Sequence, residues 1–154
     1  MNKNSIQDLK ELIRAGLGKT PAHTVVRHGQ LVNVVTREIY PADIAIHKDT
    51  IVAVGDVAAY IGPDTRFIDA GGKYLVPGLI DGHLHSECSK MSLTSFAKAV
   101  VPSGTTSIVS GLDEYISVSG LEGLREVLDE MKQGPLKVFW GAPFKTPYTF
   151  PPST

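Results

Sequence analysis

The stretch that decides the fold is VPGLIDGHLHSECS, Val76 to Ser89. The apolar run from Tyr74 to Ile80 has the length and composition of a strand, and it leads directly into the run Asp-Gly-His-Leu-His. Side chains alternate between the two faces of a strand, so His83 and His85, two residues apart, are expected to point the same way at the strand's end. Two imidazoles placed like this predict a pair of nitrogen ligands for Zn²⁺, Fe²⁺ or Mn²⁺.

A bare His-x-His pair is also common among ordinary surface residues. The metal interpretation is favoured here because a strand precedes the pair and acids flank it, Asp81 on the face of the histidines and Glu87 just after them. Glu87 shares that face only if the strand continues past His85. The neighbouring Cys88 is interpreted as a small buried filler, with a soft metal ligand as the alternative.

Length and composition predict one ordinary folded domain of 154 residues, because 42% hydrophobic residues suffice to bury a core. With 15 basic and 16 acidic residues there is no basic surplus, so we expect no nucleic-acid partner. We see no apolar run that would span a membrane or serve as a signal peptide, and therefore expect no membrane partner. A single cysteine excludes an intramolecular disulfide and indicates a reducing, cytoplasmic location.

The residues before the decisive stretch divide into a helix and a strand-rich segment. Apolar residues at helical spacing predict a helix over 5–17, which nearby glycines and Pro21 end. The pattern then changes to period two and predicts a small antiparallel sheet or half-sandwich. Its five short strands are expected at 24–27, 31–36, 39–46, 51–54 and 66–69. The histidines of this part are interpreted as surface or turn residues without metal partners; they are His23, His28 and His47.

From Tyr74 onward strands and helices alternate. Strands are expected at 74–80, 105–110 and 136–140, with helices at 92–101 and 121–132 between them. Short connections between such elements imply a parallel sheet with right-handed crossovers. The segment 142–154, with four prolines and no periodicity, is expected to be loop.

A resemblance to a known family starts from these residues. V-P-G-L-I-D-G-H-L-H resembles the first barrel strand of the metal-dependent amidohydrolase superfamily, and the Ser-Glu-Cys-Ser after it most resembles the adenine deaminase branch, which carries H-x-H-x-E-S-S. The resemblance implies an α/β fold with a small β-sandwich part and the start of a (β/α)₈ TIM barrel, incomplete in this chain. It divides the chain into an N-terminal helical extension (1–20), a partial β-sandwich domain (21–73) and the first β/α units of the barrel (74–154).

The same resemblance implies the N-terminal portion of a hydrolase acting on C–N bonds. The reaction would be hydrolytic deamination of a purine or related nitrogen heterocycle by metal-bound hydroxide, a step of purine metabolism. His83 and His85 would hold zinc, manganese or iron, in a binuclear centre in the intact enzyme, and the catalytic residues would lie downstream of Thr154. A complete barrel needs about 250 residues, so we expect this chain to be inactive alone, its partner being the missing C-terminal part or a second chain. We also expect a homo-oligomer.

Two loops after the barrel strands are expected to line the pocket. Asp113 and Glu114 follow the second strand at the loop-bearing end, where adenine deaminases carry Asp-Pro-His-Glu; the histidine is missing here. The segment after the third strand, from Gly141, also departs from the branch pattern. These departures leave the hydrolase class intact and put adenine itself in doubt. Two alternatives remain: a cyclic amidase of the dihydroorotase or allantoinase kind, which usually has an arginine after H-x-H, and a non-catalytic subunit.

Overall fold

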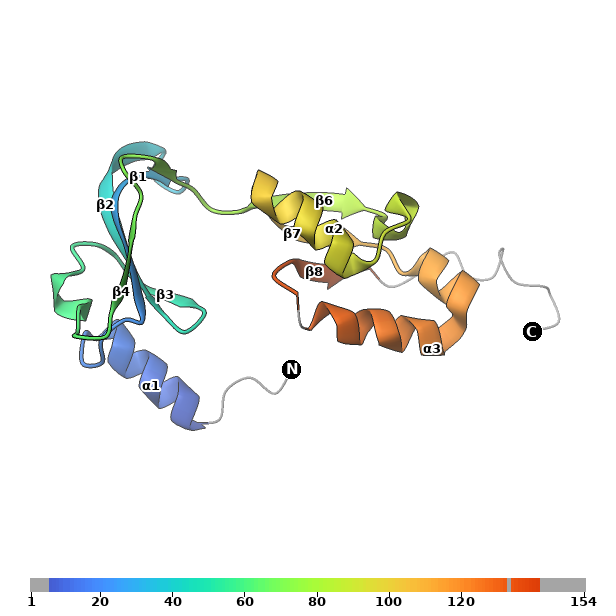
Figure 1. Ribbon diagram of the computed structural model, residues 1–154, viewed down its shortest axis with the longest axis horizontal. Coiled ribbons are helices and arrows are strands. Elements are labelled where there is room, and N and C mark those ends of the chain that lie inside the picture. The colour runs from blue at the N-terminus through green and yellow to red at the C-terminus, as the bar shows by residue number, and fades with distance from the viewer. Residues whose placement is uncertain (1–5, 133, 142–154) are drawn as a thin grey trace. The chain divides into compact units, whose positions relative to one another are not determined.

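The computed structural model describes residues 6–132 and 134–141, and the chain folds as two compact units, Met1–Pro77 and Gly78–Thr154 (Figure 1). Among the described residues, no helix combines the length and the apolar character needed to cross a membrane. The expected loop at 142–154 lies outside the described residues.

The first unit begins with helix α1 (Ile6–Gly16), within one residue of the predicted helix. Ala15 is its fully buried residue, and its other ties to the sheet are polar. Lys48 Nζ lies 2.6 Å from Glu11 Oε2, and the hydroxyl of Tyr60 donates to the carbonyl of Gly16 at 3.0 Å. Three apolar residues of the helix, Ile6, Leu9 and Ile13, are exposed, as is Leu17 just after it, and Leu12 is half-buried.

The surface interpretation of His47 is wrong. Its side chain is 1% exposed and stacks on His23 with 4.2 Å between ring centroids. Nδ1 lies 3.1 Å from the carbonyl oxygen of Pro21, and Nε2 lies 3.0 Å from Glu11 Oε1. Burial is tolerated because both ring nitrogens have hydrogen-bond partners.

One sheet forms the rest of this unit. Its strands are β1 (Thr24–Asn33), β2 (Glu38–His47), β3 (Thr50–Gly55), β4 (Arg66–Asp69) and β5 (Tyr74–Leu75), and a short 3₁₀ helix, η1 (Ala58–Tyr60), joins β3 to β4. The order is β3-β2-β1-β4, with β5 also on β1. Strands β1, β2 and β3 pair antiparallel as expected, but β4 and β5 run parallel to β1. The sheet is therefore mixed, and the assignment of this segment to a partial β-sandwich stays a prediction.

Two of the predicted strands, 24–27 and 31–36, are one strand with an irregularity. The pairing of β1 with β2 shifts register between Val26 and Gly29. His28 there has φ 59°, and its backbone N–H donates to Asp43 Oδ1 at 2.9 Å. The irregularity between the two predicted strands is therefore a β-bulge, because the extra residue is taken up in the left-handed conformation without ending the strand.

The strand expected at 74–80 is in fact two strands. Tyr74–Leu75 pairs with Gln30–Leu31 in the first sheet, and β6 (Leu79–Leu84) begins a second sheet. Pro77 separates them because it has no backbone N–H to donate to a ladder. The two units divide after Pro77, four residues beyond the boundary drawn after residue 73.

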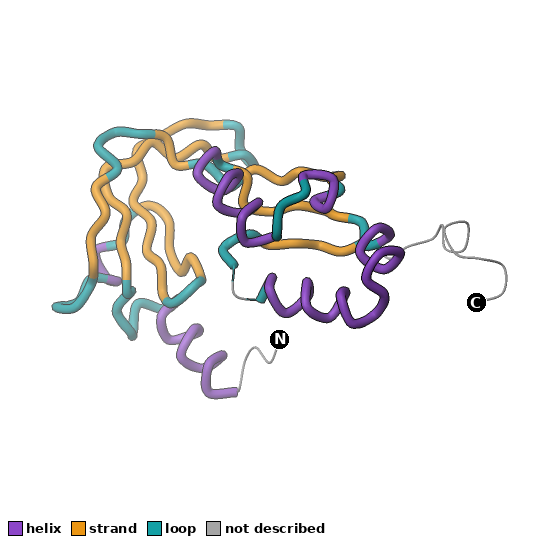
Figure 2. Tube along the Cα trace, turned by 45° about the vertical axis from the view of Figure 1, so that its right-hand side comes forward, coloured by secondary structure: helices purple, strands orange, loops and turns teal. Residues whose placement is uncertain are grey.

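The second unit contains the predicted alternation of strands and helices. Its strands β6, β7 (Thr105–Ser110) and β8 (Lys137–Trp140) lie side by side in that order, all parallel (Figure 2). Helix α2 (Leu93–Val100) connects the first pair and α3 (Asp113–Met131) the second, with short 3₁₀ helices η2 (Ser86–Ser89) and η3 (Val101–Ser103) at either end of α2. The core consists of Phe96, Ala97, Ile108 and Leu136.

Helix α3 starts earlier than predicted. It begins at Asp113, eight residues before the expected start, and has a break at Gly120, where φ is 62° and ψ is −160°. The first segment was missed because its serines and glycine resemble a loop. The acids of its first turn, Asp113 and Glu114, favour a helix because they lie at the positive end of the helix dipole. Ser117 Oγ donates to the Asp113 carbonyl at 2.7 Å.

Candidate metal centre

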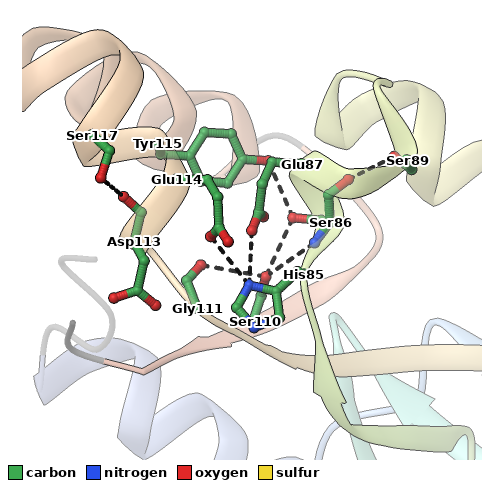
Figure 3. Close-up of polar contacts among 10 residues, drawn as sticks. All are labelled: His85, Ser86, Glu87, Ser89, Ser110, Gly111, Asp113, Glu114, Tyr115 and Ser117. Atoms are coloured by element: carbon green, nitrogen blue, oxygen red, sulfur yellow. Dashed lines mark hydrogen bonds and ion pairs between the residues drawn. The ribbon is translucent and has the colours of Figure 1, made fainter. Parts of the chain in front are cut away.

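The candidate site lies where two neighbouring parallel strands end. The carboxyl end of β6 leads into His85 and η2, and the carboxyl end of β7 leads through Gly111 into α3 (Figure 3). Leu84 and Ser110 are paired at this edge of the sheet. In parallel β/α units, ligands bind at this edge because the loops that follow the strands gather there.

The two histidines lie together as their spacing predicts. The ring centroids of His83 and His85 are 5.3 Å apart, and the rings meet edge to face at 71°. His83 is exposed and His85 is partly buried. The side chain of Asp81 turns toward the backbone, where its Oδ1 accepts a hydrogen bond from the N–H of His83 at 3.1 Å. This bond stabilises the backbone at the end of β6.

Glu87 reaches the site by a route that the sequence did not predict. The strand does not continue past His85; the chain turns into η2, and His85 is the residue before it. The turn brings Glu87 Oε1 to 2.9 Å from His85 Nδ1, with the side chain 12% exposed. Cys88, on the same turn, is exposed, so its interpretation as a buried filler is wrong.

The second turn adds two more carboxylates. Glu114 Oε2 lies 3.2 Å from His85 Nδ1. His85, Asp113 and Glu114 each offer a ligand atom within 4.8 Å of the others, which is a grouping that could hold a metal ion. The structure therefore gathers Glu87, Asp113 and Glu114 around His85, while His83 joins the group through its ring contact.

The charges of the group are mutually dependent. Hydrogen bonds to Glu87 and then Glu114 raise the pKa of His85 above its usual value. Burial, followed by the hydrogen bond with Glu114, raises the pKa of Glu87, whereas the pKa of Glu114 is lowered, chiefly by the same bond. Of the two adjacent carboxyl groups, Glu87 therefore gives up its proton at higher pH than Glu114, because two adjacent carboxylates do not both ionise readily.

The donor set fits a divalent metal. Glu87 Oε2 and Asp113 Oδ1 are buried and have no hydrogen-bond partner among the described residues. A buried carboxylate oxygen without a partner is costly, and Asp113 belongs to the group that could hold a cation. Imidazole and carboxylate together are the ligands that zinc, manganese and iron sites use.

Sequence reasoning missed the residues that pack behind this group. Ser86 and Ser110 are each 1% exposed, and Tyr115 OH lies 3.1 Å from Ser86 Oγ. Gly111 approaches His85 so closely that a Cβ there would lie 2.9 Å from His85 Cε1. The available signal was their position, since Ser86 and Tyr115 adjoin predicted site residues, Ser110 ends a predicted strand and Gly111 follows it.

Comparison with known proteins gives relatives along nearly the whole chain. Adenine deaminase 1 of Desulfotalea psychrophila is 70% identical over 146 residues, which are 95% of this chain and 25% of that protein. Adenine deaminase 1 of Latilactobacillus sakei is 66% identical over 146 residues, again 25% of its length. The chain thus spans about a quarter of the length of the curated relatives it matches. No family model matches it.

Solved structures agree on the fold. A crystal structure of an adenine deaminase aligns with 79% of this chain and 30% of its own, with a TM-score of 0.50 and 28% identity. A D-hydantoinase from Bacillus sp. AR9 aligns over 77% of this chain and 26% of its own, at TM-score 0.57 and 24% identity, which supports the fold alone. A D-aminoacylase with a binuclear metal centre covers 58% of this chain and 18% of its own, at TM-score 0.50 and 28% identity.

The parallel β/α units and the site at their strand ends are similar to part of the TIM-barrel amidohydrolases among these neighbours, which include an adenine deaminase. Within that class its sequence is adenine deaminase-like, over about a quarter of the length of those enzymes.

Proposed function

We propose that this chain is the N-terminal portion of a hydrolase that releases ammonia from a purine or a related nitrogen heterocycle. The observation that carries the proposal is the convergence of imidazole and carboxylate groups at one edge of a parallel sheet, with two buried carboxylate oxygens that have no described partner. The relatives named adenine deaminase favour a purine-type substrate.

We assign the metal to His83 and His85, with Asp113, Glu114 and Glu87 at its margin. A divalent ion held there supplies a Lewis acid and acidifies water at the site. Zinc, manganese and iron all suit the donor set, and a second ion in the intact enzyme is part of the proposal. The cytoplasmic location and the homo-oligomer stay predictions.

The glutamate pair adds a way to hold a proton at the site. The pKa of Glu87 is raised and the pKa of Glu114 is lowered, so two carboxyl groups of unequal proton affinity lie side by side at His85. Such a pair can pass a proton to or from a ligand without a net charge change. The principal catalytic base is expected downstream of Thr154.

The test separates metal binding from turnover. Zn²⁺ or Mn²⁺ is titrated calorimetrically into the chain and into its His83→Ala and His85→Ala variants, with His28→Ala as the control. His28 is an exposed histidine of the first unit whose Nδ1 contacts Asp69. Both site variants should lose binding and the control should keep it.

Ammonia release from adenine and other amino-substituted heterocycles is then measured. We expect turnover from the gene product that carries this chain with its adjoining residues, and weak metal binding without turnover from the 154-residue chain. Equal metal affinity in the parent and His85→Ala would contradict the metal assignment. Clear turnover by the chain alone would contradict its role as one portion of the site.

A further inference from the structure

Three hydroxyl groups form a continuous chain behind the candidate metal centre (Figure 3). Tyr115 OH lies 3.1 Å from Ser86 Oγ, and Ser86 Oγ lies 3.3 Å from Ser110 Oγ. Ser110 Oγ in turn reaches the carbonyl oxygen of Gly111 at 3.5 Å and accepts the N–H of Ser86 at 3.4 Å. We refer to Tyr115, Ser86 and Ser110 as the hydroxyl chain.

The direction of its hydrogen bonds follows from counting protons. The carbonyl of Gly111 can only accept, so Ser110 donates to it. Ser110 has then used its proton, so Ser86 donates to Ser110, and Tyr115 donates to Ser86. Each of the three hydroxyl groups therefore donates one hydrogen bond, in the order Tyr115 to Ser86 to Ser110 to the Gly111 carbonyl, and this restricts the rotation of the hydroxyls.

The hydroxyl chain joins both turns that carry the site. Ser86 lies between His85 and Glu87 on the turn after β6, and Tyr115 follows Glu114 at the start of α3. Removing Ser86 Oγ would leave the Tyr115 hydroxyl without its acceptor, and removing the Tyr115 hydroxyl would take away the bond that Ser86 Oγ accepts. The two turns are therefore linked by groups that lie outside the set of possible metal ligands His85, Asp113 and Glu114.

We infer that the hydroxyl chain positions His85 and Glu114 relative to each other and thereby sets the metal affinity of the site. The inference rests on the proposed function, because it presupposes that His85 binds a metal ion. A ligand set must hold its atoms to within about 0.2 Å of their proper distances, and the paired hydroxyls fix the two turns that bear the ligands. Tyr115 and Ser86 are thus positioning residues.

The decisive variant is Tyr115→Phe in the gene product that contains this chain. It removes one hydroxyl and keeps the ring, which meets Trp140 edge to face with 6.2 Å between centroids. Zn²⁺ affinity should fall about 10- to 100-fold, the usual effect of removing a group that supports a metal ligand. The visible absorption of the Co²⁺-loaded protein, which reports the coordination of the ion, should change as well.

A matched control is Tyr60→Phe, which removes a tyrosine hydroxyl bonded to the carbonyl of Gly16 in the first unit. It should leave Zn²⁺ affinity and the Co²⁺ spectrum as in the parent, with a comparable change in melting temperature of the metal-free protein. A loss caused only by weakened folding would instead appear in both variants.

Each result has a separate meaning. If the parent protein binds no Zn²⁺, both the proposed function and this inference are contradicted. A parent that binds Zn²⁺ while Tyr115→Phe binds within twofold, with an unchanged Co²⁺ spectrum, overturns the inference and leaves the function standing. Should Tyr115→Phe not fold, as judged by circular dichroism, Ser86→Ala decides by the same criteria.

Discussion

Replacing Gly111 by alanine should separate metal binding from stability. Gly111 lies in the loop between β7 and α3, against the His85 ring. A Cβ there would lie 2.9 Å from His85 Cε1, 3.3 Å from His85 Nδ1 and 3.2 Å from Asp113 Oδ2. The methyl group would therefore press on two of the side chains that form the candidate centre.

The size of the effect follows from these distances. Carbon atoms in contact prefer a separation of about 3.5–4.0 Å, so the ring of His85 must move by about 0.6–1 Å. That displacement exceeds the tolerance of about 0.2 Å for a metal ligand. We expect a loss of about 10- to 100-fold in Zn²⁺ affinity, which corresponds to about 1.4–2.8 kcal/mol. The backbone itself should benefit, because alanine in place of glycine stabilises by about 0.4–1 kcal/mol where its conformation is allowed.

The assay is a pair of measurements on each protein: Zn²⁺ titration by calorimetry, and urea unfolding without metal. Gly141→Ala is the control, because a Cβ at residue 141 would meet only the carbonyl of Ser110 at 3.8 Å, an ordinary contact. Gly111→Ala should lose affinity without losing stability, and Gly141→Ala should lose neither. Parental affinity in Gly111→Ala would refute the reasoning that His85 is a ligand held in place by this close approach.

Three further outcomes are expected. Because its hydrogen bond to Glu87 raises the pKa of His85 above 6.5, the ring's contribution to metal-free stability is present below pH 6.5 and is lost as pH rises through the raised pKa. As pH rises over the same range, Zn²⁺ affinity should increase, because a proton no longer competes for the ring. From pH 6 to 8 the melting temperature of the metal-free protein should therefore fall while the Zn²⁺ affinity measured by titration rises. The pKa of Glu130 is lowered, chiefly by its hydrogen bond with Thr94 at the start of α2. Glu130→Gln should therefore lower the free energy of unfolding in urea by about 0.5–1.5 kcal/mol at pH 7. The difference from the parent should shrink as pH falls below 4.5, and a difference that stays constant would contradict this. His47→Leu should lower the free energy of unfolding, measured in urea, by about 1–3 kcal/mol, because it leaves the carbonyl of Pro21 without its partner and takes one of two partners from Glu11; an unchanged free energy would show that the buried ring contributes only packing.

Local patterns in the sequence predicted the second unit well. The alternation of strands and helices after residue 78 follows from periodicity, which is a property of neighbouring residues. The facing of His83 and His85 needed only the two-residue repeat of a strand, and the rings do lie together. The placement of Asp113 and Glu114 needed one further rule, that parallel strands deliver their loops to the same edge.

What the sequence could not predict depended on distant partners. Tyr74–Leu75 belongs to the first sheet because it pairs with Gln30–Leu31, a match that no local pattern encodes. His47 is buried because a glutamate of α1 meets its ring. Glu87 reaches His85 through a turn, where continuation of the strand was the expected route.

The attachment of α1 by its polar side has a practical consequence for handling the protein. Ion pairs between partly exposed groups, such as Lys48 with Glu11, weaken as the Debye length shrinks to about 3 Å at 1 M salt. The helix should then open from the sheet more often, and trypsin should cut faster at the exposed Arg14 and Lys19. Purification at high salt would therefore expose more of the apolar surface of α1, and low-salt buffers would keep the helix packed against the sheet.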